Sequence, residues 1–250
     1  MLSIIIITKN EAFHIQRCLE SVAWADEIIV FDSGSDDETV AICQQFTQHV
    51  FVTDWPGFGL QKQRALDKAT QQWVLSIDAD EVITPELKDE ILNALSEQTT
   101  AGYLIPRLSN YCGREIKHSG WWPDYVLRLF RRDQGHFSAE LVHEQVLVTG
   151  KLAHLTNPIL HDAFLNPEEV LHKLNNYSSL GAEKLFQQHK SASLGLAIVK
   201  GFWAFIRTYF IKAGFLDGPE GLMLAISNAE GTYYKYLKLR QLVKSNSQHD

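Results

Sequence analysis

Cysteine is scarce in this chain of 250 residues, which has only Cys18, Cys43 and Cys112. Three scattered thiols are too few for a disulfide framework or a zinc site. Their scarcity favours a reducing compartment, the cytosol. Net positive charge is also missing. The formal net charge is -7, which disfavours broad, nonspecific binding to nucleic acid, so no nucleic-acid partner is expected.

Several sequence signatures are absent as well. No secretory leader is expected, because the apolar run at residues 2–7 has no basic segment before it and is followed at once by Lys9 and Glu11. No Gly-x-Gly-x-x-Gly follows the first expected strand and no Gly-Lys-Ser/Thr loop is present, which counts against a dinucleotide oxidoreductase and a P-loop NTPase. What the chain does have is 45% hydrophobic residues, enough for the core of a large α/β domain.

Apolar, β-branched runs alternate with helical patterns through the first 95 residues. Strands are expected at 3–8, 27–32, 49–53 and 73–78, and helices at 10–22, 38–45, 57–70 and 85–95. Helix starts are assigned to an Asn10 cap, a Ser35/Glu38 capping box and the pair Thr84-Pro85. This spacing is typical of right-handed βαβ units and predicts half of a nucleotide-binding α/β domain.

The segment at residues 73–81 organises this half. It begins as a buried strand and ends in three carboxylates, Asp78, Asp80 and Glu81. In an open α/β sheet, ligands bind at the carboxyl ends of the strands. Asp78 and Asp80 lie two residues apart and would point to one side if the extended conformation continues. Two carboxylates there suit Mg²⁺ or Mn²⁺, with substrate phosphates completing the shell; a solvated loop or helix cap is the alternative.

The second half of the chain has a different pattern. Strands of mixed polarity are expected at 103–111, 125–131 and 144–152, separated by glycines, and they would form edge strands and the acceptor half of a cleft. From residue 167 onward the chain reads as three helices, near 167–189, 194–214 and 219–240. The predicted division is therefore a catalytic domain at 1–165, with halves 1–95 and 96–165, and a helical region at 166–250.

Four motifs occur in order within the first 81 residues. They are Ile-Ile-Ile-Ile-Thr-Lys-Asn-Glu at 4–11, Val-Phe-Asp-Ser-Gly-Ser-Asp-Asp-Glu-Thr at 30–39, Gly-Phe-Gly-Leu-Gln-Lys-Gln-Arg-Ala-Leu at 57–66 and Leu-Ser-Ile-Asp-Ala-Asp-Glu at 75–81. Together they resemble the inverting glycosyltransferases of family 2, which have the GT-A fold, a Rossmann-like mixed α/β sheet. Arg-Leu-Phe-Arg-Arg at 128–132, Val-His-Glu at 142–144 and Pro-Ile-Leu-His at 158–161 extend the resemblance to the lipopolysaccharide-core β-1,4-glucosyltransferase subgroup.

The resemblance implies roles for the residues that would bind a UDP-sugar. Thr8, Asn10 and Glu11 would lie beside the nucleoside, and Asp32 would accept the uracil imide N–H; the alternative for Asp32 is a turn cap. Lys62 and Arg64 would approach the base or the diphosphate, where cations suit phosphate oxygens, unless they are ordinary solvated helix charges.

The resemblance also implies a set of metal ligands. Asp78 would hold the ribose or the donor sugar and stand near the divalent cation, Mg²⁺ or Mn²⁺, which Asp80 would bind. His161 is the first candidate to complete the metal shell and His143 the second. A lone histidine is, however, more often structural than a ligand.

Inverting transfer also needs a base for the attacking hydroxyl group. Glu144 is the first candidate and Asp124 the second; the alternative is that both carboxylates pair with arginines, namely Arg128, Arg131 or Arg132. Trp121 and Trp122 offer flat apolar faces on which sugar rings stack, although core tryptophans would look the same.

The segment at residues 194–216 is long enough to span a bilayer. Lys200, Arg207 and Lys212 argue against spanning, at roughly 2.5–3.5 kcal/mol each near the bilayer centre. On a helical wheel Lys200 and Arg207 lie together and aromatic residues lie opposite, which is typical of an interfacial helix. A helix packed on the catalytic domain is the alternative.

These observations predict a cytoplasmic enzyme on the inner face of the bacterial inner membrane. It would need a divalent cation and move a hexose, first of all glucose from UDP-glucose, to a sugar hydroxyl of a lipopolysaccharide core or related glycolipid. One rival is a nucleotidyltransferase, which lacks support because no Gly-rich phosphate loop follows the first strand. The other is a noncatalytic nucleotide-sugar-binding or membrane scaffold protein, against which the acidic residues and Glu144 argue.

Overall fold

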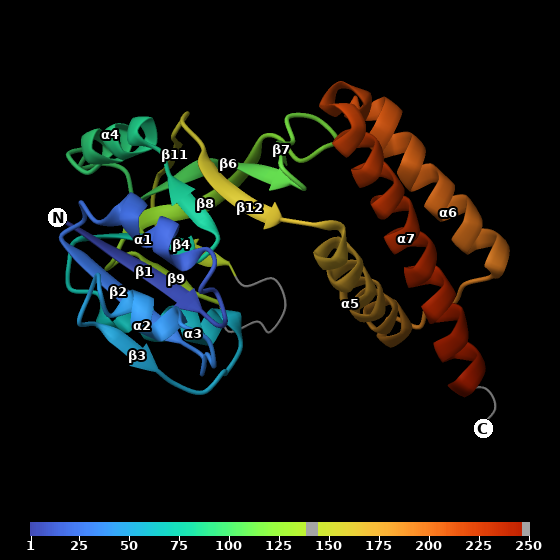
Figure 1. Cartoon of the computed structure of the whole chain (residues 1–250), viewed down its shortest axis with the longest axis horizontal. Helices are drawn as coiled ribbons and strands as arrows, with labels where there is room; N and C mark the ends of the chain where they lie inside the picture. The colour runs from blue at the N-terminus through green and yellow to red at the C-terminus, as the bar shows by residue number, and fades with distance from the viewer. Residues whose placement is uncertain (139–144, 247–250) are drawn as a thin grey trace. The chain divides into compact units, whose positions relative to one another are not determined.

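The computed structural model describes residues 1–138 and 145–246 and divides the chain into two compact units (Figure 1). The first unit comprises Met1–Leu108 and Asp124–His161, and the second comprises Ser109–Pro123 and Asp162–Asp250. Residues 109–123, assigned from the sequence to the acceptor half of the catalytic domain, group with the C-terminal helices.

Four parallel strands form half of the sheet in the first unit, in the order β3-β2-β1-β4. Their bounds are Leu2–Thr8 (β1), Glu27–Asp32 (β2), Val50–Val52 (β3) and Trp73–Asp78 (β4). Thr8 lies opposite Asp32, and Ile7 lies opposite Asp78. Because the strands are parallel and in this register, their polar carboxyl ends meet at one edge of the sheet, as the sequence predicts.

Each face of this sheet has its own hydrophobic core, because side chains alternate along β1. Leu2, Ile4 and Ile6 contribute to one core, and Ile5 and Ile7 to the other. The first core includes side chains of α1, α2 and α4, and the second includes side chains of α3, β9 and β10. The bounds of these elements are Ile15–Val22 (α1), Thr39–Cys43 (α2), Phe58–Lys68 (α3), Pro85–Ala94 (α4), Gly135–Phe137 (β9) and Val146–Val148 (β10).

The sheet continues beyond β4 in the order β8-β6-β12-β5. Pairing is antiparallel between β4 and β8, between β8 and β6 and between β12 and β5, whereas β11 pairs with β6 in parallel. Their bounds are Asp124–Arg131 (β8), Gly102–Tyr111 (β6), Ile159–Phe164 (β12), Glu81–Ile83 (β5) and Leu152–His154 (β11). The prediction that β6 and β8 lie at an edge was wrong, since both are interior strands. The single strand expected at 144–152 was also wrong, because β10 and β11 are separate strands with Gly150 between them at φ 132°.

Two of the three predicted helix caps are absent, because the side chains of Asn10 and Ser35 bind other groups in the structure. Thr84 caps α4 as expected, since its hydroxyl accepts the N–H of Leu87. Asn10 does not cap α1; it takes a left-handed conformation and its side chain accepts the N–H of Asp36. Ser35 is likewise bound to the loop after β2 and not to a capping box, and α2 begins only at Thr39.

Three helices dominate the second unit, as the sequence predicts, and α7 contacts both α5 and α6 (Figure 1). The elements are Arg114–Glu115 (β7, paired with the end of β6), Pro167–Gln187 (α5), Leu194–Ile206 (α6), the π-helical turn Arg207–Ile211 (η1), the 3-10 turn Gly214–Asp217 (η2) and Gly218–Asn246 (α7). Gly201 allows α6 to approach α7 closely. A Cβ atom there would lie only 3.1 Å from the carbonyl oxygen of Ala229 and from the Cβ atom of Tyr233.

Candidate active site

The carboxyl end of β4 makes a tight acidic turn. β4 ends at Asp78, Ala79 and Asp80 form the turn, and β5 begins at Glu81. The Glu81 carboxylate accepts the backbone N–H of Asp78 at 2.9 Å. The extended conformation therefore stops before Asp80, so the two-residue alternation expected for Asp78 and Asp80 does not hold.

Asp78 is neutralised by two buried cations. The Lys62 ammonium from α3 lies 2.9 Å from one oxygen of Asp78, and the Arg128 guanidinium from β8 donates to the other oxygen. Burial raises the pKa of Asp78, but the charges of Arg128 and Lys62 outweigh burial and hold that pKa well below its usual range. Asp78 is thus a fixed anion bound to two protein cations.

Glu81 links Asp78 and its two cations to a second ion pair, Arg107 with Asp124. Its fully buried carboxylate lies 2.6 Å from Arg128 and 3.5 Å from Arg107 of β6. Arg107 also donates twice to Asp124, at 2.7 and 3.1 Å. We call these six residues, Lys62, Asp78, Glu81, Arg107, Asp124 and Arg128, the ion-pair cluster.

The partner of Asp124 differs from the three arginines considered from the sequence. Arg107 takes that place, because β6 and β8 pair in a register that sets Arg107 opposite Asp124. Arg131 instead donates to the backbone carbonyl of Thr100, and Arg132 to that of Gln71.

A pocket of about 530 Å³ opens beside the ion-pair cluster, within the first unit. Lys62, Asp78, Arg107 and Arg128 line it together with Tyr125 and Phe137, among others. Three cations and one carboxylate line the wall. Each cation is already ion-paired within the cluster, but positive groups outnumber carboxylates on the pocket surface, which favours an anionic ligand with an apolar or sugar part. Arg128 is 7% exposed, and its buried Nε atom has no hydrogen-bond partner among the described residues.

The side chains predicted to bind a nucleoside lie at the ends of β1 and β2. The hydroxyl group of Thr8 is buried and has no hydrogen-bond partner among the described residues. Asp32 is fully buried and accepts the N–H groups of Gly34 and Ser35 at 2.9 and 2.8 Å. The hydroxyl group of Thr8 thus stays unused within the described part of the chain, whereas Asp32 holds the turn after β2.

Asn10 and Glu11 follow Thr8 and are bound to that same turn and to α1. The N–H of Asn10 donates to Ser35, and the N–H of Glu11 donates to Thr39 at 2.8 Å. The Glu11 carboxylate lies 2.9 Å from the Nδ1 atom of His14. The loops after β1 and β2 are thus joined by hydrogen bonds, which fixes the edge of the sheet where both strands end.

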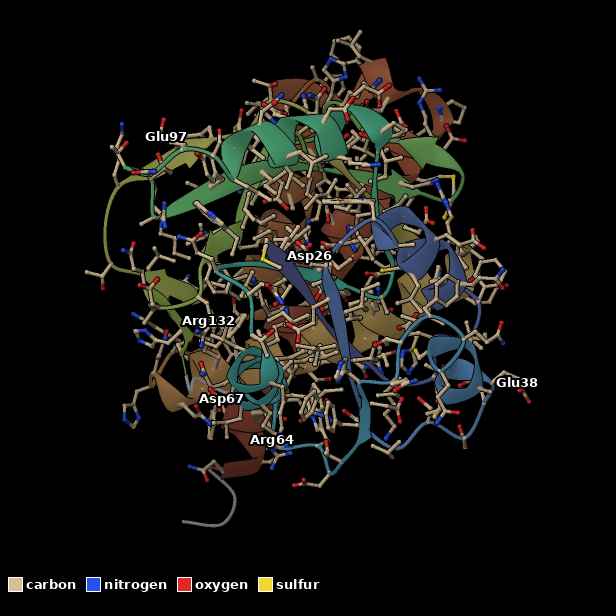
Figure 2. The ribbon with its side chains drawn as sticks, turned by 90° about the vertical axis from the view of Figure 1, so that its left-hand side faces the viewer. Asp26, Glu38, Arg64, Asp67, Glu97 and Arg132 are labelled. Atoms are coloured by element: carbon tan, nitrogen blue, oxygen red, sulfur yellow. The ribbon has the colours of Figure 1, made fainter. Side chains whose placement is uncertain are left out.

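Arg64 and Lys62 lie on the same helix but have different environments. Lys62 is buried and lines the pocket, whereas Arg64 pairs with the exposed Asp54 at 2.9 Å. Figure 2 shows Arg64 and Asp67 on α3, and Asp67 is exposed. The structure therefore brings Lys62, but not Arg64, into the pocket wall.

Asp80 meets His161, the histidine that the resemblance singled out. β12 pairs with β5 so that His161 lies opposite Glu81, and the Nε2 atom of His161 is 3.4 Å from a carboxylate oxygen of Asp80. An oxygen and a nitrogen donor converge, which fits a divalent cation that takes its other ligands from phosphates and water. In residues 1–138 and 145–246, no three His, Cys, Asp or Glu residues gather as a metal site. Glu144 and His143 lie outside the described residues.

Sequence reasoning missed Glu81, Arg107 and Arg128 as site residues. The missed signal was the mixed polarity of β6 and β8: a charged residue in an interior strand needs a charged partner. Arg107 and Arg128 are such residues, and their partners are the acids that end β4, begin β5 and begin β8.

Replacing Glu81 with Gln is expected to lower stability strongly. The change leaves Arg128 and Arg107 without one buried counter-charge while keeping the size of the side chain, so we expect a loss of about 3 kcal/mol. That corresponds to a fall in melting temperature of about 6–12 °C by differential scanning calorimetry. The matched control is Glu38→Gln at an exposed carboxylate labelled in Figure 2, which should cost less than about 0.5 kcal/mol. Equal shifts for the two variants would contradict the role given to Glu81.

The fold defines a class of protein: a GT-A-like enzyme with a mixed, partly parallel sheet and C-terminal helices. The family model of glycosyl transferase family 2 matches residues 3–146, more than half of the chain. The protein therefore belongs to glycosyltransferase family 2 and is a transferase.

Similar sequences match this chain along nearly its full length. An uncharacterized glycosyltransferase of Rickettsia prowazekii is 32% identical over 96% of this chain and 87% of its own length. The lipopolysaccharide core biosynthesis glycosyltransferase LpsC of Rhizobium meliloti is 30% identical over 99% of this chain and 98% of its own. Among solved structures, S. aureus TarS 1–349 in complex with UDP has a TM-score of 0.50 and 16% identity, covering 98% of this chain and 91% of that one, which supports the fold.

Proposed function

We propose that this enzyme moves a hexose, with glucose from UDP-glucose as the first candidate, to a sugar hydroxyl of a bacterial lipopolysaccharide core or related glycolipid. The observation that carries the proposal is the cationic pocket beside the carboxyl end of β4, built on a family 2 sheet. The similarity to LpsC, named for lipopolysaccharide core biosynthesis, supports the class of acceptor.

The donor would lie along the edge of the sheet. Thr8, with its buried and unused hydroxyl, would contact the nucleoside together with Asn10, Glu11 and Asp32. Lys62 and Arg128 would face the diphosphate, and Asp78 would keep both cations oriented while offering its exposed edge to the ribose or donor sugar. Arg64 would approach the ligand only by leaving Asp54.

Asp80 and His161 would hold a divalent cation, Mg²⁺ or Mn²⁺, since their donor atoms already converge. Such a cation supplies counter-charge for a departing nucleoside diphosphate. Asp78 is a weaker candidate ligand, because both of its oxygens contact protein cations. The protein's own cations, Lys62 and Arg128, would share in neutralising the leaving group.

Glu144 would remove the proton from the attacking hydroxyl group of the acceptor. The residues that follow it, Gln145 and Val146, line the same pocket as Asp78, which supports this assignment. Asp124 is the second candidate, but its carboxylate already accepts two hydrogen bonds from Arg107.

A transfer assay tests this proposal. Purified protein would be incubated with a panel of UDP- and GDP-sugars, Mn²⁺ and a lipopolysaccharide-core glycolipid, and nucleotide release and glycolipid mass would be followed. We expect release to depend on the acceptor and the glycolipid mass to rise by one hexose. Binding of a UDP-sugar without transfer and without slow hydrolysis would favour the noncatalytic scaffold.

A membrane-surface role belongs to the same proposal. In the described part of the chain, Leu194–Ile211 is the one segment whose length and apolar character suit a bilayer crossing, and only 17% of it is buried. Phe202, Trp203 and Phe210 are more than half exposed, as are Ile198 and Val199. Aromatic exposure on a helix that also carries exposed cations fits a helix lying in the membrane interface.

Binding to anionic vesicles is expected to fall with salt and with loss of these cations. Replacing Lys200 and Arg207 together with Gln should weaken binding about 10–30-fold, because each exposed cation near an anionic surface contributes about 1 kcal/mol. Flotation with vesicles that contain anionic lipid measures it. The matched control is the pair Lys184→Gln and Lys190→Gln, two exposed lysines outside α6, which should bind nearly as the parent does.

The aromatic residues separate a membrane helix from a structural brace. Phe202→Ser should release the protein from vesicles and barely change its melting temperature, because that side chain is 67% exposed. A parent protein that does not bind vesicles, with a large loss of stability in Phe202→Ser, would make this helix a brace.

A further inference from the structure

A second pocket, of about 270 Å³, lies wholly within the second unit. Its walls come from α5 and α7, and from Tyr111, Trp121 and Phe164 beside them. This volume is at the small end for ligand sites and is closer to one sugar ring than to a nucleotide.

Aromatic rings form one side of this pocket. Trp121 and Phe164 are stacked with centroids 6.2 Å apart, and Tyr111 meets Trp121 edge-on at 5.8 Å. Trp121 and Phe164 are only partly buried, so part of the aromatic surface faces the pocket. Flat apolar rings with polar groups nearby suit the amphipathic face of a sugar.

The charged side chains of the lining are cationic. Lys173 and Lys235 line the pocket, while no Asp or Glu does so among the described residues. The Lys173 ammonium donates to the carbonyl oxygen of Ala163 at 3.0 Å and lies 4.7 Å over the ring of Phe164. The Lys235 ammonium lies 5.3 Å over the ring of Tyr236, so it can donate to a ligand without breaking an ion pair.

Hydrogen-bonding groups of α7 complete the lining. Ser227, Asn228 and Thr232 present two hydroxyl groups and one amide to the pocket. The Ser227 hydroxyl lies 3.0 Å from that of Tyr111, and the Asn228 amide donates to Thr208. Neutral donors and acceptors beside two ammonium groups suit a polyhydroxylated ligand with a negative charge.

A glycine inside α7 leaves room for such a ligand. Gly231 lines the pocket, and a Cβ atom added there would touch only Leu174, at 3.5 and 3.9 Å, which is ordinary contact. Helix packing therefore does not require glycine at 231, unlike Gly201, although glycine costs a helix interior about 1 kcal/mol relative to Ala. The missing side chain keeps the wall of the pocket open.

We infer that this pocket binds a single sugar ring carrying an acidic group, a carboxylate or a phosphate. The aromatic wall receives the ring, and Lys235 and Lys173 receive the charge. The inference rests on the residues of the second unit; it depends on the proposed function only where the glycolipid acceptor is named as the source of the acidic sugar.

Ligand-observed saturation-transfer NMR tests the inference on the full chain, with UDP and the diamagnetic ion Mg²⁺ in excess to occupy the first unit. The probes are glucuronic acid and glucose 6-phosphate, with glucose as the neutral comparison. We expect the acidic sugars to bind at least about tenfold more tightly than glucose, through charge-assisted hydrogen bonds that weaken with salt. Equal signals for glucose and the acids, no binding of either acid, or displacement of the acids by UDP would each overturn the inference.

Two variants locate the binding. Lys235→Gln should weaken binding of the acidic sugars about tenfold, while Lys244→Gln, which removes an exposed charge from the same helix, should change it less than twofold. Gly231→Leu should block binding by filling the pocket, with melting temperatures checking the fold of each variant. Unchanged binding in Lys235→Gln would contradict the site.

Competition separates the two sources of an acidic sugar. If the ligand is a glycolipid headgroup, free glucuronic acid should compete with binding of lipopolysaccharide-core micelles, and Lys235→Gln should weaken micelle binding. If neither glucuronic acid nor Lys235→Gln changes micelle binding, while the free acids still bind at Lys235, the pocket binds free acidic sugars. If the protein transfers no hexose but the acidic sugars still bind at Lys235, the result counts against the proposed function and not against this inference.

Discussion

Asp80→Ala is expected to reduce turnover with a UDP-sugar by at least about 10³-fold, because Asp80 is the proposed carboxylate ligand of the metal and its loss would remove counter-charge from the departing diphosphate. Activity of the parent should vanish with excess chelator and return with Mn²⁺ or Mg²⁺, whereas neither ion should restore the variant at ordinary concentrations. Initial rates of nucleotide release measure both effects.

The matched control for this change is Asp67→Ala on the exposed side of α3 (Figure 2), whose carboxylate accepts a hydrogen bond from Gln63. Its turnover and metal dependence should match those of the parent. His161→Ala should show a smaller version of the Asp80 defect, since it removes the second donor beside Asp80. Full turnover of the parent in excess chelator would remove the metal from the mechanism.

Glu144→Gln is expected to lower kcat by about 10²–10⁴-fold and leave the affinity for UDP nearly unchanged, because a general base acts on the acceptor hydroxyl and not on the nucleotide. Steady-state kinetics with a fixed glycolipid acceptor, together with UDP titrations, separate the two quantities.

Asp124→Asn is the comparison for the base. That change breaks the two hydrogen bonds from Arg107 and should affect stability as well as rate. Near-normal turnover in Glu144→Gln, combined with a large loss of kcat in a folded Asp124→Asn, would move the role of base to Asp124.

The parallel half of the fold was predictable because its signals are local. The apolar runs of β1, β2 and β4 are buried on both faces, and each ends where a polar residue begins the loop. The Thr84-Pro85 helix start was predictable for the same reason, since the cap and the N–H that it accepts lie three residues apart.

The loop side chains were harder to place because their partners are distant in sequence. Asn10 could cap α1, but the N–H of Asp36 offers it a hydrogen bond across the joined loops. Ser35 makes three hydrogen bonds there, two with Asp32 on its own loop and one with Asn10 across from it. Local sequence rules identify the residues that can cap a helix, but tertiary contacts determine which group each side chain binds.

The ion-pair cluster depends on the register in which β6 and β8 pair, and the sequence patterns did not predict that register. Arg107 meets Asp124 only because β6 and β8 pair with an irregularity between Tyr103 and Leu104. A shift of one residue would turn Arg107 to the other face. Asp78 and Lys62 were therefore predictable from their motifs, whereas Glu81, Arg107 and Arg128 were not recognised as members of the cluster.

Calorimetric titration of UDP into the parent and into Asp80→Ala, each in Mn²⁺ and in excess chelator, tests most directly whether a nucleotide diphosphate and a metal share the edge of this sheet. We expect the parent to bind UDP at least about tenfold more tightly with Mn²⁺ than with chelator, and the variant to lose that difference. Equal UDP affinity of the parent in both conditions, or the same Mn²⁺ enhancement in Asp80→Ala, would contradict a metal-assisted nucleotide site at Asp80.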